Sequence, residues 1–283
     1  MSWPPKNILV GTDFSASSEA ALHAAAAIAR RDGARIELVH VLPPRLRPLA
    51  GFEPLDVLIS PDPVVELEAT ERRASELAQR WAPGLCRVRV IEGEPVSMLV
   101  TLREELDADL VVLGAGGLRG ARHFFLGSVA EKMLDHPGCP LLLTTRTTSA
   151  GEFKRVLIAQ ESPRSKSSSL EIAVRLARDE RSEVIALHVA ATSSAELERQ
   201  RASAGIAARI GQIDPTAPAQ VIVRRGDPAR EIVRAAREFG ADLVVLGAEQ
   251  NRPDYGPGAV VKALSRSDQP ALLIVWPSPT EKE

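Results

Sequence analysis

The chain carries one sequence pattern twice, and this duplication constrains its fold more than any other feature. Residues 7–13 resemble residues 155–161, which lie 148 positions later, and residues 108–115 recur unchanged at 241–248, which lie 133 positions later. The second copy is therefore 15 residues shorter between these two matches. Two copies, each as long as a domain, indicate a tandem duplication rather than a solenoid. We expect one domain at residues 1–148 and a second at residues 152–278.

Apolar runs alternate with helix-forming segments along the first copy. Its strands are expected at residues 8–11, 35–42, 86–91, 110–113 and 141–145, and its helices at 17–31, 61–81, 95–106 and 127–135. This order predicts an α/β fold in which helices cover both faces of a mostly parallel sheet. Such sheets bind ligands at the carboxyl ends of their strands, where the strand order reverses.

Composition excludes several classes of function. The net charge of the 283 residues is −2, so no bulk positive charge attracts nucleic acid or an anionic membrane. Two cysteines, Cys86 and Cys139, are too few for a disulfide framework and suit a reducing compartment. No stretch approaches 18 apolar residues, and residues 1–7 have no signal-peptide core. We therefore expect a cytoplasmic protein without nucleic-acid or membrane partners.

A glycine-rich loop follows the fourth predicted strand. It runs from Gly114 to Ser128 with the spacing G-x2-G-x9-G-S, and a helix follows it at once. Glycines let main-chain N–H groups approach a phosphate, and the amino end of a helix favours an anion. The pattern is neither a Walker A loop nor the dinucleotide fingerprint. A plain glycine-rich surface loop is the alternative interpretation.

Together, the residues 8–15, the strand 111–114 and this loop resemble the ATP-binding branch of the universal stress protein family, and the likeness extends over nearly all of both halves. The resemblance implies two Rossmann-like domains of the adenine-nucleotide-hydrolase type, each a five-stranded parallel sheet of order 3-2-1-4-5. It also implies that the domains pair through their last strands. A homodimer of such chains is a further expectation.

Site residues follow from the same resemblance. Asp13 would contact the nucleoside of ATP, or of another adenine nucleotide, and the main chain of Val41 would meet the adenine edge. The phosphates would be held by four residues of the loop, Gly114, Gly117, Gly127 and Ser128, with Mg²⁺ or Mn²⁺ accompanying them. Asp13 as a turn or helix-cap residue and Val41 as a core residue are the alternatives.

The second copy departs from this pattern. Glu161 stands at the position of Asp13, Gln250 at that of Gly117, and Pro257-Gly258 at that of Gly127-Ser128. Because Pro257 has no N–H group, one donor is missing, and we expect the second half to bind no ATP. The first copy also has an extra proline-rich segment at residues 43–62, which is either a flap over the nucleotide or an elaborated surface loop.

Together with the family resemblance, these residues predict a stress-response protein that binds ATP in its first half. It would act as a nucleotide-dependent sensor or regulator toward an unidentified protein partner. We assign no catalytic residue, because no general base or water-positioning residue is evident. We also assign no protein metal ligand, because the cysteines and histidines form no zinc-binding motif. A slow ATPase or phosphotransferase and a nucleotide-free scaffold are the two alternatives.

Overall fold

A computed structural model describes residues 3–44, 63–116, 126–148, 153–160, 168–190, 196–247 and 270–276. Several predicted features lie outside these residues. They are most of the 43–62 segment, Gly117, and Glu161, Gln250, Pro257 and Gly258 of the second copy.

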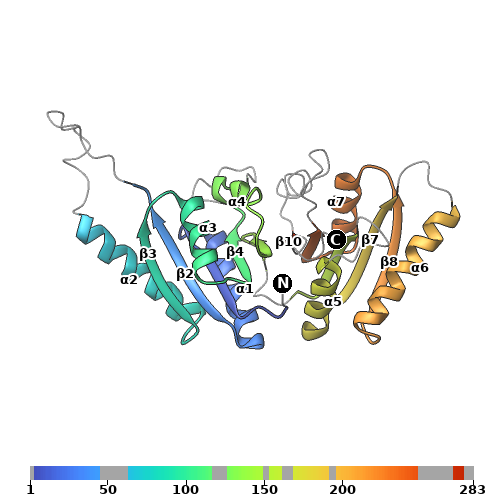
Figure 1. The fold of residues 1–283 in the computed structure, drawn as a ribbon, viewed down its shortest axis with the longest axis horizontal. Helices are drawn as coiled ribbons and strands as arrows, with labels where there is room; N and C mark the ends of the chain where they lie inside the picture. The colour runs from blue at the N-terminus through green and yellow to red at the C-terminus, as the bar shows by residue number, and fades with distance from the viewer. Residues whose placement is uncertain are drawn as a thin grey trace.

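Each half alternates strands and helices (Figure 1). The first half contains β1 (Asn7–Gly11), α1 (Ala16–Asp32), β2 (Arg35–Leu42), α2 (Pro63–Trp81), β3 (Cys86–Glu92), α3 (Pro95–Glu105), β4 (Leu110–Gly114), α4 (Ser128–Met133) and β5 (Leu141–Thr144). The second contains β6 (Arg155–Gln160), α5 (Ser168–Glu180), β7 (Glu183–Ala190), α6 (Glu196–Ile213), β8 (Ala219–Arg225), α7 (Pro228–Glu238), β9 (Leu243–Gly247) and β10 (Ala271–Val275). The expected helix at 127–135 is shorter than predicted.

Local sequence signals explain several helix ends. Ser15 caps α1, and Gly33 ends it with a φ of 71°, a left-handed conformation that suits glycine. Pro95 and Pro228 open α3 and α7 after the carboxylate caps Glu94 and Asp227. In the described parts of the chain, no helix combines the length and apolarity needed to cross a membrane.

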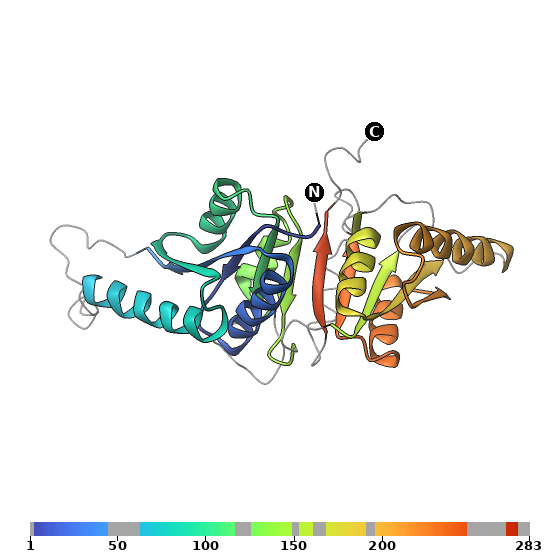
Figure 2. The ribbon, with the colours of Figure 1, turned by 90° about the horizontal axis from the view of Figure 1, so that it is seen from below.

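The strands form one ten-stranded sheet. Its order is β3-β2-β1-β4-β5-β10-β9-β6-β7-β8, so each half has the 3-2-1-4-5 order. All neighbours within a half are parallel, and β5 pairs with β10 in antiparallel register, with Leu142 opposite Leu273. Figure 2 shows β10 beside the first half. The predicted α/β fold, the strand order and the pairing of the last strands are confirmed.

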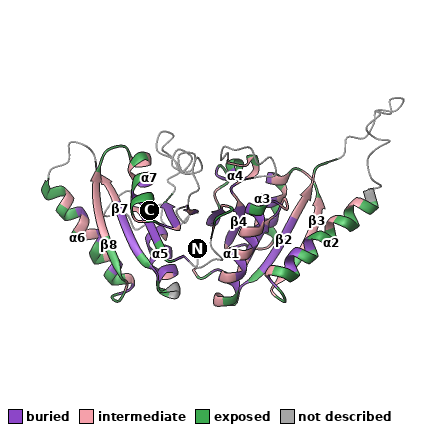
Figure 3. Cartoon of the chain, turned by 180° about the vertical axis from the view of Figure 1, so that it is seen from behind, coloured by how far each residue is buried: buried purple, intermediate pink, exposed green. Residues whose placement is uncertain are grey.

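The sheet separates two apolar clusters. One lies under α1, α2, α5 and α6, and the other lies under α3, α4 and α7. Each cluster includes residues of both halves, because Leu142 and Leu273 face the first while Leu143 and Leu272 face the second. Buried residues are concentrated in the inner strands and the inner helix faces, whereas the outer strands β3 and β8 are only partly buried (Figure 3). The two halves therefore share a continuous core.

The repeated Asp109 and Asp242 have matching structural roles. Asp109 Oδ2 accepts hydrogen bonds from the main-chain N–H groups of Lys6 at 2.8 Å and Asn7 at 3.0 Å. Asp242 accepts from Lys154 and Arg155 at the same two distances. Each carboxylate thus holds the start of the first strand of its own half against the start of the fourth, which explains why the copies share this residue.

Replacing Asp109 with alanine is expected to lower the free energy of unfolding by roughly 1–3 kcal/mol, because two donors lose a charged acceptor. Urea unfolding followed by circular dichroism measures the change. The exposed Glu76 of α2 provides the control, and Glu76→Ala should change stability by less than about 0.5 kcal/mol. Equal stability of the two variants would contradict this role.

Candidate functional site

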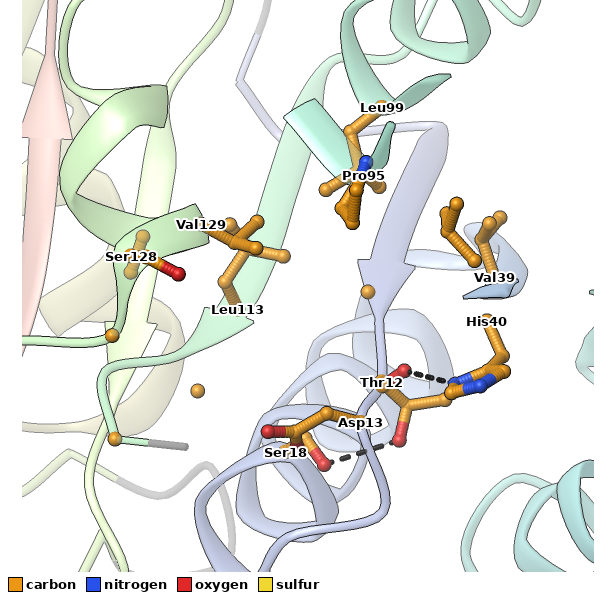
Figure 4. A pocket seen from close by; sticks show the side chains of 16 residues that line it. Thr12, Asp13, Ser18, Val39, His40, Pro95, Leu99, Leu113, Ser128 and Val129 are labelled. Carbon is orange, nitrogen blue, oxygen red and sulfur yellow. Dashed lines mark hydrogen bonds between the residues drawn. The ribbon is translucent and has the colours of Figure 1, made fainter. Parts of the chain in front are cut away.

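A pocket opens at the carboxyl ends of β1, β2 and β4, beside the starts of α3 and α4 (Figure 4). Its volume is about 170 Å³. Ligand pockets usually measure roughly 300–1,000 Å³, so the described walls enclose only part of a nucleotide-sized ligand. The lining residues are Gly11, Thr12, Asp13, Ser18, Val39, His40, Val41, Pro95, Leu99, Leu113, Gly114, Gly116, Gly127, Ser128, Val129 and Ala130.

Five of the six predicted site residues line this pocket. They are Asp13, Val41, Gly114, Gly127 and Ser128, and the sixth, Gly117, lies outside the described residues. Sequence reasoning missed the apolar wall that α3 and α4 contribute, which includes Pro95, Leu99 and Val129. Their signal was present, since each sits at or near the start of a predicted helix that follows a strand.

Asp13 lies in a turn that neighbouring groups hold firmly. The N–H of Thr12 donates to the carbonyl of Val39 at 2.9 Å, and Nδ1 of His40 lies 2.7 Å from the carbonyl oxygen of Thr12. One carboxylate oxygen of Asp13 accepts the N–H of Ser15 at 3.0 Å. Ser15, not Asp13, caps α1. Asp13 therefore has a turn role with Oδ1 and also borders the pocket.

The histidines that the two copies share make the same contact. His188 Nδ1 lies 2.9 Å from the carbonyl oxygen of Gln160, as His40 Nδ1 does from that of Thr12. A carbonyl oxygen only accepts, so Nδ1 carries the proton in both residues. This repetition assigns the bond to the fold and supports a structural rather than catalytic role for both histidines.

Phe14 adopts a backbone conformation that is rare for its residue type. Its φ is 60°, and its N–H donates to Thr12 Oγ1 at 3.0 Å. The centroids of the Phe14 and His40 rings lie 4.6 Å apart. The guanidinium carbon of Arg73, on α2, lies over the Phe14 ring at 4.3 Å from its centroid. Left-handed conformations of bulky residues persist only where their surroundings hold them. Sequence reasoning did not identify this stack.

Gly114 and Gly116 lack side chains for different reasons. A Cβ on Gly114 would lie 2.7 Å from the backbone of Ser17 and Ser18, so glycine lets β4 approach the start of α1. A Cβ on Gly116 would have its nearest neighbour, Ser17 Oγ, at 3.7 Å, so packing alone does not require glycine there. The Ser17 hydroxyl donates to the Gly116 carbonyl and ties the loop to α1.

The start of α4 borders the pocket without a side-chain cap. Gly127 is the N-cap residue, and its own N–H donates to the carbonyl of Ala115 at 2.7 Å. The Ser128 hydroxyl therefore does not cap the helix. Because the Gly127 amide is already paired, the amides that the start of α4 can offer a ligand are those of the residues after Gly127.

The charge of the described wall is low. Asp13 is the one charged side chain among the described residues that line the pocket.

The two cysteines lie away from this pocket. Burial raises the pKa of the Cys86 thiol to about 11 and that of Cys139 to about 12, so both thiols stay protonated at neutral pH. In the described parts of the chain, no group of three or more His, Cys, Asp or Glu side chains could hold a metal ion.

Comparison with known proteins gives one consistent family. A model of the universal stress protein family matches residues 5–145 and again residues 152–256. A Staphylococcus aureus (strain USA300) protein named for this family is 27% identical over 150 residues, which cover 53% of this chain and 89% of that protein.

Solved structures agree at the level of the fold. A universal stress protein from Archaeoglobus fulgidus DSM 4304 has a TM-score of 0.70 and 21% identity, over 95% of this chain and 98% of that one. A functionally unknown protein from Pseudomonas aeruginosa PAO1 has a TM-score of 0.67 and 16% identity, over 97% of this chain and 93% of that one. Both likenesses extend over the two halves together.

Proposed function

The chain belongs to the universal stress protein family, and on this premise we propose that its first half binds an adenine nucleotide, ATP in particular. Bound nucleotide would change the surface that this half presents to a protein partner, which makes the protein a sensor or regulator. The proposal is carried by one observation. Residues from three separated segments of the sequence, at the ends of β1, β2 and β4, converge on one pocket.

The lining residues suit the parts of such a ligand. Val39, Leu99 and Val129 supply apolar surface for a base, as ligand pockets usually do. Asp13 offers acceptor oxygens to ribose hydroxyls or an amino group. Gly116 and Ser128 border the side where phosphates would lie. A divalent ion would be bound by the phosphates of the nucleotide rather than by protein side chains. That ion would neutralise phosphate charge.

Binding fits this pocket better than efficient turnover. Asp13 and His40 are the titratable side chains among the described lining residues, and Nδ1 of His40 is engaged by Thr12. Hydrolysis needs a group that orients water at the terminal phosphate. Asp13 would be engaged by the nucleoside, and His40 lies on β2 beside Val41, on the strand proposed to meet the adenine rather than the terminal phosphate. A single-turnover assay with ATP and Mg²⁺ should therefore give a rate near that of buffer.

Only the first half is proposed to bind ATP. The replacements at Glu161, Gln250 and Pro257 support this assignment from the sequence, because they change a carboxylate, remove a glycine and remove an N–H donor. The second half instead contributes β10, which closes the sheet edge at β5.

Isothermal titration calorimetry of the full chain with ATP and Mg²⁺ tests both statements. We expect one nucleotide per chain. A ligand held only by the folded state stabilises it, so ATP at a 100-fold excess over Kd should add about 2.7 kcal/mol to the free energy of unfolding.

Two other results would contradict the proposal. Silent heats with ATP, ADP, AMP and adenosine, together with unchanged stability, would favour the scaffold function. A stoichiometry of two would place a second nucleotide site in residues 152–278.

A further inference from the structure

A stack of three side chains, Arg73, Phe14 and His40, joins α2 to the turn that carries Asp13. The Arg73 guanidinium lies 4.3 Å from the Phe14 ring centroid, and the Phe14 ring lies 4.6 Å from that of His40. Arg73 itself is exposed on α2, and its neighbour Ala74 is fully buried. A cation over an aromatic face is attracted to the ring, and the His40 ring makes a second, tilted contact with the same Phe14 ring.

This stack acts on the backbone beside Asp13. Phe14 directly follows Asp13 and has a φ of 60°, a conformation that is strained for a bulky residue where nothing supports it. The N–H of Phe14 donates to Thr12 Oγ1, and the next N–H, that of Ser15, donates to Asp13 Oδ1. Holding the Phe14 ring therefore holds the turn that orients the Asp13 carboxylate.

The duplicated half serves as an internal comparison. The bond from His40 to the turn recurs as His188 to Gln160, so it belongs to the fold. The ring does not recur, because the position that matches Phe14 is Ser162. The stack is thus confined to the half that also carries Asp13 and the complete glycine pattern. A general folding requirement would apply to both halves.

Resting on the proposed function, we infer that Arg73 is a positioning residue for the nucleotide pocket, which it serves by holding the Phe14 ring over the Asp13 turn. It is not among the described residues that line the pocket, and it acts through Phe14. Arg72 is its matched control, since it is an exposed arginine one position away on the same helix.

The test compares Arg73→Gln, Arg73→Lys and Arg72→Gln in the full chain. Calorimetry with ATP and Mg²⁺ should show a Kd about two- to five-fold higher for Arg73→Gln. Arg73→Lys keeps the cation and should bind like wild type, as should Arg72→Gln. In an Asp13→Ala background, Arg73→Gln should add no further loss, because the group that it positions is gone.

Hydrogen exchange of the ligand-free protein gives a reading independent of ATP. The amides of Phe14 and Ser15 should exchange faster in Arg73→Gln and not in Arg72→Gln. If wild type binds no nucleotide, the proposed function fails, and these two amides alone decide whether Arg73 holds the turn. If wild type binds ATP but Arg73→Gln matches it in both Kd and exchange, the inference is overturned while the proposed function stands. Equal weakening by Arg72→Gln would reveal a bulk charge effect and would also overturn it.

Discussion

Asp13→Asn should weaken ATP binding by about 10- to 100-fold. Asp13 is the one charged side chain among the described pocket-lining residues, and Oδ1 is engaged by the Ser15 amide. Asparagine keeps a carbonyl oxygen for that bond, so the turn should remain in place. The change removes the charge that strengthens hydrogen bonds from ligand hydroxyls or amines, an effect of about 1.5–3 kcal/mol for a charged partner.

The control for this experiment is Asp135→Asn, the same charge change at an exposed carboxylate that does not line the pocket. Calorimetry with ATP and with adenosine measures both variants. Adenosine separates the two sides of the ligand, since it carries no phosphate charge that Asp13 could repel. Unchanged or tighter binding of both ligands by Asp13→Asn would remove Asp13 from the nucleoside side of the site.

Much of the fold could be predicted because its signals are local or repeated. The duplication implied two similar domains, and residues such as Gly33, Pro95 and Pro228 mark helix ends through their own backbone preferences. Buried parallel strands read as short apolar runs, and β4 and β9 have the same sequence, Leu-Val-Val-Leu-Gly. The order of the strands came from the family resemblance and not from these signals.

Parts of the site could not be predicted because they depend on contacts between distant segments. Gly114 was expected to serve phosphate, yet its missing side chain also admits the backbone of Ser17 and Ser18. The engaged amide of Gly127 depends on the position of Ala115. Nothing local to Phe14 predicts that it adopts a left-handed conformation under Arg73. Composition and spacing identify which residues gather at a strand end, but not which of their groups remain free.

The junction between the halves should control the stability of the whole chain. Leu142 and Leu273 face each other across the antiparallel β5–β10 pair, and each is 2% exposed. Leu142→Ala leaves a cavity in the cluster that both halves share, and such changes cost about 2–5 kcal/mol. Val65→Ala is the control, because Val65 is 57% exposed and its truncation should change stability by less than about 0.5 kcal/mol.

Hydrogen exchange in increasing urea, read peptide by peptide, follows each half of the Leu142→Ala variant separately. We expect strands of the second half such as β7 and β9 to lose protection at the same lowered urea concentration as β1 and β4, although the substitution lies in the first half. The reason is that loss of β5 exposes β10, whose side chains belong to the apolar clusters on both faces of the sheet. Neither half therefore keeps a complete core alone. If β7 and β9 instead lost protection at the wild-type urea concentration, the halves would unfold independently. The effect of a nucleotide bound in the first half could then not be transmitted to the second half through the sheet.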